Sequence, residues 1–153
     1  MVACTFFGHR DCPETIKPRL REVLLDLITN RNVEMFYVGH QGQFDAHVHS
    51  ELKKIKQEYP QINYAVVLAY MPGRKTEYDD YSDTMFPEGI ESVHPHYAIS
   101  WRNNWMLKQS GYVVTYITHF WGGAAQYAKK ARIQRKHIIN LGDYIAESNF
   151  NML

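Results

Sequence analysis

The 153-residue sequence contains only two cysteines and carries almost no net charge. Two cysteines are too few for a disulfide framework, so we expect a reduced, cytoplasmic protein with Cys4 in the core and Cys12 in a loop. A formal net charge of +1 provides no overall attraction to nucleic acid or to an anionic membrane. No apolar run approaches the length of a membrane span, and the first apolar run is too short for a signal peptide. Repeats, linkers and low-complexity segments are also absent, so the length predicts one domain over 1–153.

Apolar and β-branched runs predict strands, and apolar residues at helical spacing predict the helices that connect them. The first predicted strands lie over 2–7, 35–38 and 64–70. A helix is predicted over 16–30 with Thr15 as its N-cap. A second helix ends at Pro60 and has Phe44, Val48, Leu52 and Ile55 on its inner side. This alternation predicts parallel pairing with right-handed crossovers. We therefore expect a Rossmann-like α/β fold, doubly wound, with a mostly parallel sheet of about five strands and helices on both faces.

The alternation breaks at 71–96, which holds three prolines, two glycines and six acidic residues. We predict a long acidic loop there, with a short strand or turn inside it. Beyond it the pattern predicts a helix with Tyr97, Trp101, Trp105 and Lys108 in one row, a strand near 113–117, a further helix, a last strand over 136–141 and a tail over 142–153. Exposed aromatic residues on the first of these helices would suit a homo-oligomer.

The acidic loop has two interpretations. Its acidic and aromatic residues are Glu77, Tyr78, Asp79, Asp80, Tyr81, Asp83 and Glu88. They form either a lid over a ligand, supplying a general base or oxygen ligands for a cation, or a partner surface or disordered excursion. An all-acidic lid would repel a phosphate unless Arg74, Lys75 or a cation intervened. This favours either a ligand bridged by a cation such as Mg²⁺ or a loop that turns away from the ligand.

Four glycine-bearing loops leave strands at the same edge of the predicted sheet: GHRD, GHQGQFD, YMPGRK and HFWGG. Ligands of open parallel sheets bind at the carboxyl ends of the strands, where the strand order reverses. With the first strand in the middle, 8–10 and 121–123 face each other across that crevice. A Gly-Gly turn into a helix presents unpaired amides to a phosphate or carboxylate, although it can also be a plain tight turn.

Three segments resemble motifs of the SLOG superfamily (Smf/DprA–LOG), especially its YpsA-like branch. They are Phe7-Gly8-His9-Arg10, the loop with Gly39, Gly42 and Asp45, and Gly122-Gly123 leading to Tyr127-Ala128. The resemblance spans about 2–141 and implies a Rossmann-like domain that holds a nucleotide or nucleotide-derived ligand. The LOG enzymes of this superfamily remove a base from a nucleoside monophosphate with a Pro-Gly-Gly-x-Gly-Thr-x-x-Glu motif. Here Trp121, Ala125, Gln126 and Lys129 stand at its Pro, third Gly, Thr and Glu positions. The missing carboxylate argues against glycoside cleavage by that route.

The expected ligand-binding residues are Gly8, His9, Arg10, Gly39, Gly42, Asp45, Trp121, Gly122, Gly123 and Tyr127. An arginine at a strand end suits a bidentate pair with phosphate, or pairs on the surface with a neighbouring carboxylate. His9 orients a ribose or phosphate oxygen, or hydrogen-bonds a neighbouring loop. Trp121 or Phe120 stacks on a base or packs against the sheet edge.

Asp45 and Glu51 are the weak candidates for catalysis. Asp45 lies in the first turn of its helix, where a carboxylate binds a ribose hydroxyl or caps the helix. Glu51 lies two turns further along, and we expect it to be solvated.

No metal site is expected. His47 and His49 lie two residues apart on a helix and point to different faces, and His94-Pro95-His96 lacks a third ligand. A basic helix end is formed by Lys129, Lys130, Arg132, Arg135 and Lys136. We interpret it as a solvated face rather than a nucleic-acid site, because no aromatic residues are interleaved with it.

The sequence therefore predicts a sensor or binding protein for a nucleotide-type ligand. The alternatives are a nucleotide hydrolase or N-glycosidase, and a DNA- or protein-binding adaptor.

Overall fold

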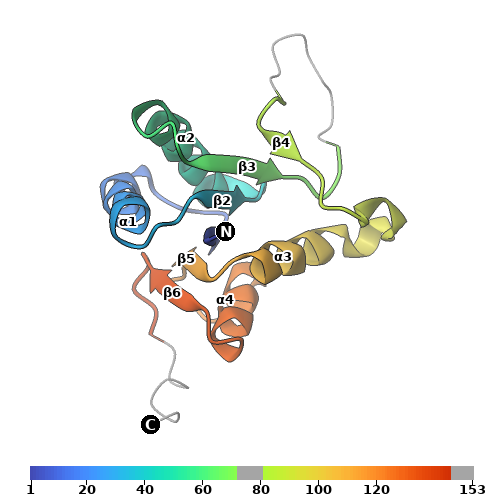
Figure 1. Ribbon diagram of the computed structural model, residues 1–153. Helices are drawn as coiled ribbons and strands as arrows, with labels where there is room; N and C mark the ends of the chain where they lie inside the picture. The colour runs from blue at the N-terminus through green and yellow to red at the C-terminus, as the bar shows by residue number, and fades with distance from the viewer. Residues whose placement is uncertain (72–80, 146–153) are drawn as a thin grey trace.

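A six-stranded parallel sheet forms the centre of the protein, with the strand order β4-β3-β2-β1-β5-β6 (Figure 1). The computed structural model describes residues 1–71 and 81–145. The strands are β1 (Ala3–Gly8), β2 (Met35–Val38), β3 (Asn63–Val67), β4 (Thr84–Met85), β5 (Tyr112–Tyr116) and β6 (His137–Asn140). The helices are α1 (Lys17–Asn30), α2 (Gly42–Glu58), α3 (Ala98–Gln109) and α4 (Gly123–Ile133), with 3-10 turns at Glu14–Ile16, Ile90–Ser92 and Pro95–Tyr97. The predicted Rossmann-like α/β fold is confirmed.

Helices cover both faces of the sheet, α1 and α2 on one and α3 and α4 on the other (Figure 1). Neighbouring residues of a strand point to opposite faces, and β1 shows this alternation. Phe6 packs in the same cluster as Leu20 of α1 and Phe44 of α2. Phe7 packs in the other cluster, with Met106 of α3 and Tyr127 of α4. Because both faces are covered, the central strands are mostly apolar, with Thr5 and Thr115 as buried polar exceptions.

The strand order reverses between β1 and β5. From β1 the chain winds through β2, β3 and β4 on one side, and β5 and β6 are then added on the other. Gly8 pairs with Tyr116 at the carboxyl ends of these two strands, and the His9 amide donates to the Tyr116 carbonyl at 3.2 Å. The crevice expected of a doubly wound sheet therefore lies at this pair of strand ends.

Several predicted boundaries shift. The short strand expected inside the acidic loop is β4, which raises the strand number from the predicted five to six. The third strand ends at Val67 rather than at residue 70. Thr15 lies in a 3-10 turn, and Ile16 is the N-cap of α1, so the predicted Thr15 cap is wrong. Cys12 is in a loop as expected but is buried.

The described part of the acidic loop is attached to the sheet. Asp83 accepts a hydrogen bond from the Tyr64 hydroxyl at 2.8 Å and contacts His49 Nε2 at 2.6 Å. Asp83 thus fastens β4 to β3 and α2, and it contributes nothing to a lid. Residues 72–80 of the loop, which include Glu77 and Asp79, and residues 146–153 of the predicted tail lie outside the described residues. Among the helices that the structure describes, none has the length and apolarity needed to cross a membrane.

Candidate functional site

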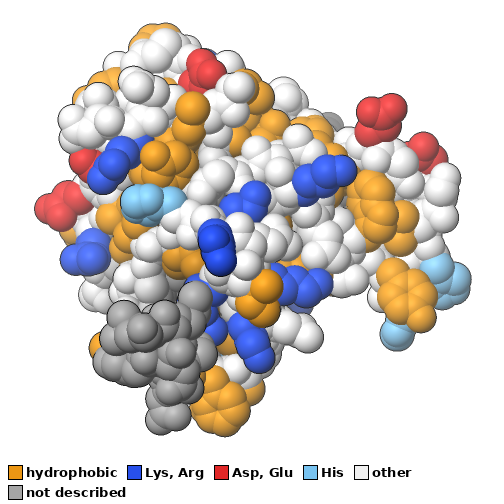
Figure 2. All heavy atoms as spheres, turned by 60° about the horizontal axis from the view of Figure 1, so that its bottom comes forward, with side chains coloured by type: hydrophobic (Ala, Val, Ile, Leu, Met, Phe, Trp, Pro, Cys, Tyr) orange, Lys and Arg blue, Asp and Glu red, His pale blue; other side chains and the backbone are white. Residues whose placement is uncertain are grey.

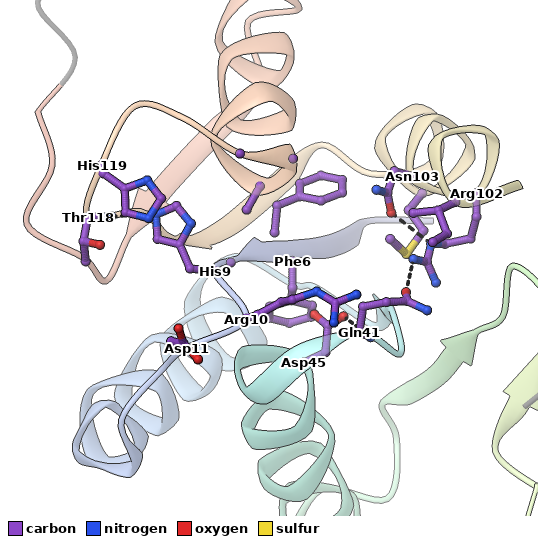
Figure 3. A pocket seen from close by; sticks show the side chains of 17 residues that line it. Phe6, His9, Arg10, Asp11, Gln41, Asp45, Arg102, Asn103, Thr118 and His119 are labelled. Carbon is purple, nitrogen blue, oxygen red and sulfur yellow. Dashed lines mark hydrogen bonds between the residues drawn. The ribbon is translucent and has the colours of Figure 1, made fainter. Parts of the chain in front are cut away.

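A cavity of about 610 Å³ opens at the strand ends where the sheet order reverses (Figure 3). Its volume lies within the range of about 300–1,000 Å³ that is usual for small-molecule sites. Four segments line it: residues 6–11 from β1 and its loop, Gln41 and Asp45 at the start of α2, one side of α3, and the loop from β5 into α4. The α3 residues are Ile99, Arg102, Asn103 and Met106, and those of the last loop and α4 are Thr118, His119, Gly122, Gly123 and Ala124.

The N-terminus of α4 is open to this cavity. Its N-cap, Gly122, has φ of 97°, and no described side chain caps the helix. The first helical hydrogen bond runs from the Gln126 amide to the Gly122 carbonyl at 3.1 Å. The amides of Gly123, Ala124 and Ala125 therefore have no partner among the described residues. These donors lie at the positive end of the helix dipole, which favours an anion.

The N-terminus of α2, in contrast, is partly occupied by the protein itself. The Arg10 carbonyl accepts from the Gln43 amide at 2.7 Å, and Asp45 Oδ2 accepts from the Gln41 amide at 2.9 Å. Gly42 has φ of +86°, and a Cβ at this position would lie 2.7 Å from the Arg10 Cα. Glycine is needed here because the loop after β1 approaches so closely, and Gly42 does not line the cavity.

Arg102 was not among the residues expected from the sequence, yet it is the most buried charge at the cavity. Its side chain is 2% exposed, and its guanidinium donates to the Val67 carbonyl at 2.7 Å, to Asn103 Oδ1 at 2.9 Å and to Gln41 Oε1. All three acceptors are neutral, and guanidinium has five N–H donors, so donors remain. Burial lowers the pKa of Arg102, and nearby Asp45 acts in the opposite direction.

Asp45 faces Arg10 and Arg102 without an ion pair to either among the described residues (Figure 3). Burial raises its pKa to about 6, and the Gln41 amide, Arg102 and Arg10 counteract that rise. A Cβ at Gly39 would lie 2.9 Å from Asp45 Oδ2 and 3.3 Å from the Arg102 Cζ. The absence of a side chain at Gly39 thus leaves room for the carboxylate of Asp45 and the guanidinium of Arg102. Both predicted roles of Asp45 fit its position, because it caps α2 and also lines the cavity.

Three rings stack at the opposite end of the cavity, and two of them, His9 and His119, line it. His9 and His119 stack with centroids 3.7 Å apart and planes 12° apart, and His119 stacks on Trp121 at 3.8 Å and 18°. The Thr118 amide donates to His9 Nε2 at 3.1 Å. His9 therefore makes the predicted contact with a neighbouring loop and also lines the cavity. Trp121 is 60% exposed and Phe120 is 73% exposed, so neither packs against the sheet edge.

The structure brings six of the predicted ligand-binding residues together around the cavity, namely Gly8, His9, Arg10, Asp45, Gly122 and Gly123. Gly39, Gly42 and Trp121 lie beside it. Tyr127 is buried beneath it, where its ring stacks on Phe7 and its hydroxyl donates to the Ser100 carbonyl at 3.0 Å.

Glu51 lies away from the cavity, and the prediction that it is solvated is wrong. It is 5% exposed, and Arg21 of α1 and Lys54 approach its carboxylate to 3.9 Å and 3.8 Å. The cation from the neighbouring helix makes burial of this carboxylate possible.

The histidine pairs have structural partners. His47 Nε2 contacts the Cys12 carbonyl at 2.7 Å, and His49 contacts Asp83. No group of three or more metal-ligating side chains occurs within residues 1–71 and 81–145.

The basic end of α4 lies on the surface. In the view of Figure 2, which brings the side of α4 and β6 forward, Lys and Arg side chains gather near the middle and acidic ones near the rim. Lys130 donates to Asn104 Oδ1 at 3.2 Å and lies over the Tyr127 ring.

Together the doubly wound sheet and its cavity define a Rossmann-like α/β domain with a cavity at the strand-order reversal. Among solved structures, the chain is similar to the X-ray structure of DNA processing protein A (DprA) from Streptococcus pneumoniae, with a TM-score of 0.67 and 13% sequence identity. The match covers 96% of this chain and 52% of that one, so this chain spans about half of DprA's length. At this identity the likeness shows the fold alone. No protein-family model and no curated protein sequence matches the chain.

Proposed function

We propose that this protein binds a nucleotide or nucleotide-derived ligand through its phosphate at the carboxyl edge of the sheet, as a sensor or binding protein. One observation carries the proposal: the open N-terminus of α4 and the cationic side chains of Arg10 and Arg102 line the same cavity of about 610 Å³. Amides at a helix N-terminus and guanidinium groups are the protein groups that most often bind phosphate.

The phosphate belongs at α4 rather than at α2. Gly123, Ala124 and Ala125 offer free amides, whereas the start of α2 is already capped by the Arg10 carbonyl and the Asp45 carboxylate. Arg10 is exposed, and Figure 3 shows it extending along the cavity floor toward Asp45 and Gln41. It can therefore move to meet a ligand.

The remainder of the ligand is assigned to the α3 side of the cavity. Ile99 and Met106 supply apolar surface, and Gln41 and Asn103 supply amide groups for polar edges of a base or sugar. Asp45 is suited to a ribose hydroxyl, because a carboxylate accepts hydrogen bonds from both hydroxyls of a diol. Gly39, Gly42 and Tyr127 shape the walls, and Trp121 borders the mouth.

The short motifs around Gly8, Gly42 and Gly123, together with the fold shared with DprA, support a place in the SLOG superfamily, and the YpsA-like branch is our proposed assignment within it. A homo-oligomer that uses the aromatic residues around α3, such as Tyr97 at 61% exposed, is part of the same proposal.

Isothermal titration of the purified chain tests whether it binds nucleotides. The panel contains nucleoside monophosphates, nucleoside diphosphates, dinucleotides and ribose 5-phosphate. Binding is expected for at least one phosphate ester and not for the corresponding nucleoside. Arg10→Gln should weaken it by roughly ten- to a hundredfold, as for a hydrogen bond to a charged group. Gln retains the Cβ and Cγ that pack beside Gly42. Arg19→Gln, on the exposed side of α1, is the matched control, and equal affinities for both variants would refute the proposed site.

A second candidate function is hydrolysis of the bound nucleotide, because the pKa of Asp45 is raised to about 6 inside the cavity. A carboxyl group with a pKa near the working pH suits general acid–base catalysis. Incubation of nucleotides with the pure protein, followed by chromatography, tests this. Release of base or ribose phosphate that is abolished in Asp45→Asn would establish that the protein is an enzyme. If the nucleotides stay unchanged, hydrolysis is ruled out and binding stands as the proposed function.

A further inference from the structure

The hydrogen bond from the Thr118 amide fixes which nitrogen of His9 carries the proton. A backbone N–H donates to His9 Nε2 at 3.1 Å, so Nε2 must hold its lone pair toward Thr118. A neutral imidazole has a single N–H, and when Nε2 accepts, that N–H is on Nδ1. His9 Nδ1 has no partner among the described residues and is not enclosed by them. His9 also lines the cavity, so Nδ1–H is available to whatever enters it.

The ring of His9 is held in place by residues of β5 and of the loop that follows it. His119 covers one face at 3.7 Å, and Tyr116 of β5 meets the ring edge-on with centroids 6.2 Å apart. His119 is itself supported by Trp121 at 3.8 Å. The His119 Nδ1 atom is buried and has no hydrogen-bond partner among the described residues. The contribution of His119 is therefore its flat ring rather than its hydrogen bonding.

We propose that His9 is a fixed, neutral hydrogen-bond donor that presents Nδ1–H to an oxygen of the ligand's phosphate, and that His119 is the positioning residue that holds it in this form. The identity of the acceptor rests on the proposed function. The tautomer of His9 and its dependence on His119 are independent of the proposed function. The site so formed selects an acceptor group at this end of the cavity and rejects a donor such as an amine.

Burial and the neighbouring His119 both favour the neutral form of His9. Burial lowers its pKa, and the adjacent His119 lowers it further. The other ionisable groups near it are Arg10 and Asp11 in its own loop, and Tyr116 at its edge. Protonation would place a second N–H on Nε2, opposite the Thr118 amide, and would break the hydrogen bond that joins the two loops. Acidification should therefore release the fixed tautomer.

Nitrogen-15 NMR of the imidazoles in the full chain at pH 7.5 tests the tautomer directly. The expected spectrum shows His9 with a protonated Nδ1 and an unprotonated Nε2. His119→Phe should preserve that pattern, because it keeps the ring and removes the unpaired nitrogen, whereas His119→Ala should give the averaged signals of a free histidine. A protonated Nε2 in the wild type would overturn the inference, and a fixed tautomer in His119→Ala would overturn the role of His119.

Titration with inorganic phosphate tests the donor role. His9→Asn places an amide N–H near the Nδ1 position and should keep most of the affinity. His9→Gln can still accept from the Thr118 amide but lacks the Nδ1 donor, and should bind phosphate roughly ten- to a hundredfold more weakly. Equal affinity in His9→Gln and the wild type would overturn the donor role. Absence of phosphate binding in the wild type would overturn the proposed function and the donor role with it, while the NMR spectra would still decide the tautomer.

Discussion

Replacing Gly123 by aspartate should stabilise the protein and at the same time strongly weaken phosphate binding. Gly123 is the first residue of α4, and a Cβ there would meet nothing within 4 Å, so the new side chain fits without rearrangement. Only Gly42, Gly89 and Gly122 among the described glycines have positive φ, so Gly123 has a backbone that aspartate can adopt.

The magnitude follows from two separate effects. A carboxylate at the positive end of a helix contributes about 0.3–1 kcal/mol, and replacing a glycine at a compatible backbone position adds about 0.4–1 kcal/mol. Together these correspond to a rise in Tm of roughly 1–8 °C for a domain of this size. The same carboxylate would face a bound phosphate at close range, where repulsion near a protein surface reaches about 4 kcal/mol. A loss of affinity of at least about a hundredfold should result.

Thermal denaturation and isothermal titration on the same samples measure both effects. Gly123→Asn separates charge from size, and should weaken binding less than Gly123→Asp. Gly111→Asp is the matched control, because Gly111 also has open space around it but precedes β5, at the opposite edge of the sheet. Unchanged phosphate affinity in Gly123→Asp would refute the placement of the phosphate at α4.

Three further substitutions test the rest of the site. Asp45→Asn should remove a fall in stability that occurs as the pH rises from about 4 to about 6, because the folded state keeps the carboxyl proton to a higher pH than the unfolded state does. Urea unfolding between pH 4 and 8 should show a gain of about 1–3 kcal/mol at pH 7.5. Gly42→Ala should cost about 1–3 kcal/mol, since it combines a left-handed backbone with contact to Arg10, and a Tm equal to that of Gly123→Ala would contradict this. Asp83→Asn should cost about 1–2 kcal/mol by weakening the contacts to His49 and Tyr64, with faster amide exchange confined to β3 and β4 as its signature.

The general fold and the place of the site could be predicted because they follow from local patterns. Apolar strands alternating with amphipathic helices indicate parallel pairing, and the topology then brings the loops after β1 and β5 together. Arg10 and Gly123, far apart in sequence, line one cavity for this reason. The strand β4 is only two residues long, which is too short for any periodicity to identify.

The two helix starts show where local patterns stop being informative. Gly42 and Gly123 give the same signal, a glycine at the first position of a helix that follows a strand. Their outcomes differ because the Arg10 carbonyl and the Asp45 carboxylate occupy the start of α2, and nothing comparable among the described residues reaches α4. Which helix is capped depends on where a distant loop folds back.

Arg102 was missed and Glu51 was misjudged for a related reason. A charge on a helix is normally expected in water, and only distant partners make its burial possible. Arg102 finds the Val67 carbonyl and Gln41, and Glu51 finds Arg21 of another helix. One local signal was present in the sequence: Arg102 stands between Ala98 and Met106 at intervals of four, in an otherwise apolar helical row. The structure shows that all three residues are buried. A charged residue within an otherwise apolar helical row is a sign of a polar cavity or a buried network.

Amide chemical-shift mapping during titration with ribose 5-phosphate is the sharpest test of phosphate binding at the N-terminus of α4. We expect the largest shifts at the amides of Gly123, Ala124 and Ala125, smaller ones at Arg10, and none at Gln43 in the capped start of α2. Shifts centred on α2, or saturable binding that leaves the α4 amides unmoved, would contradict phosphate binding at α4.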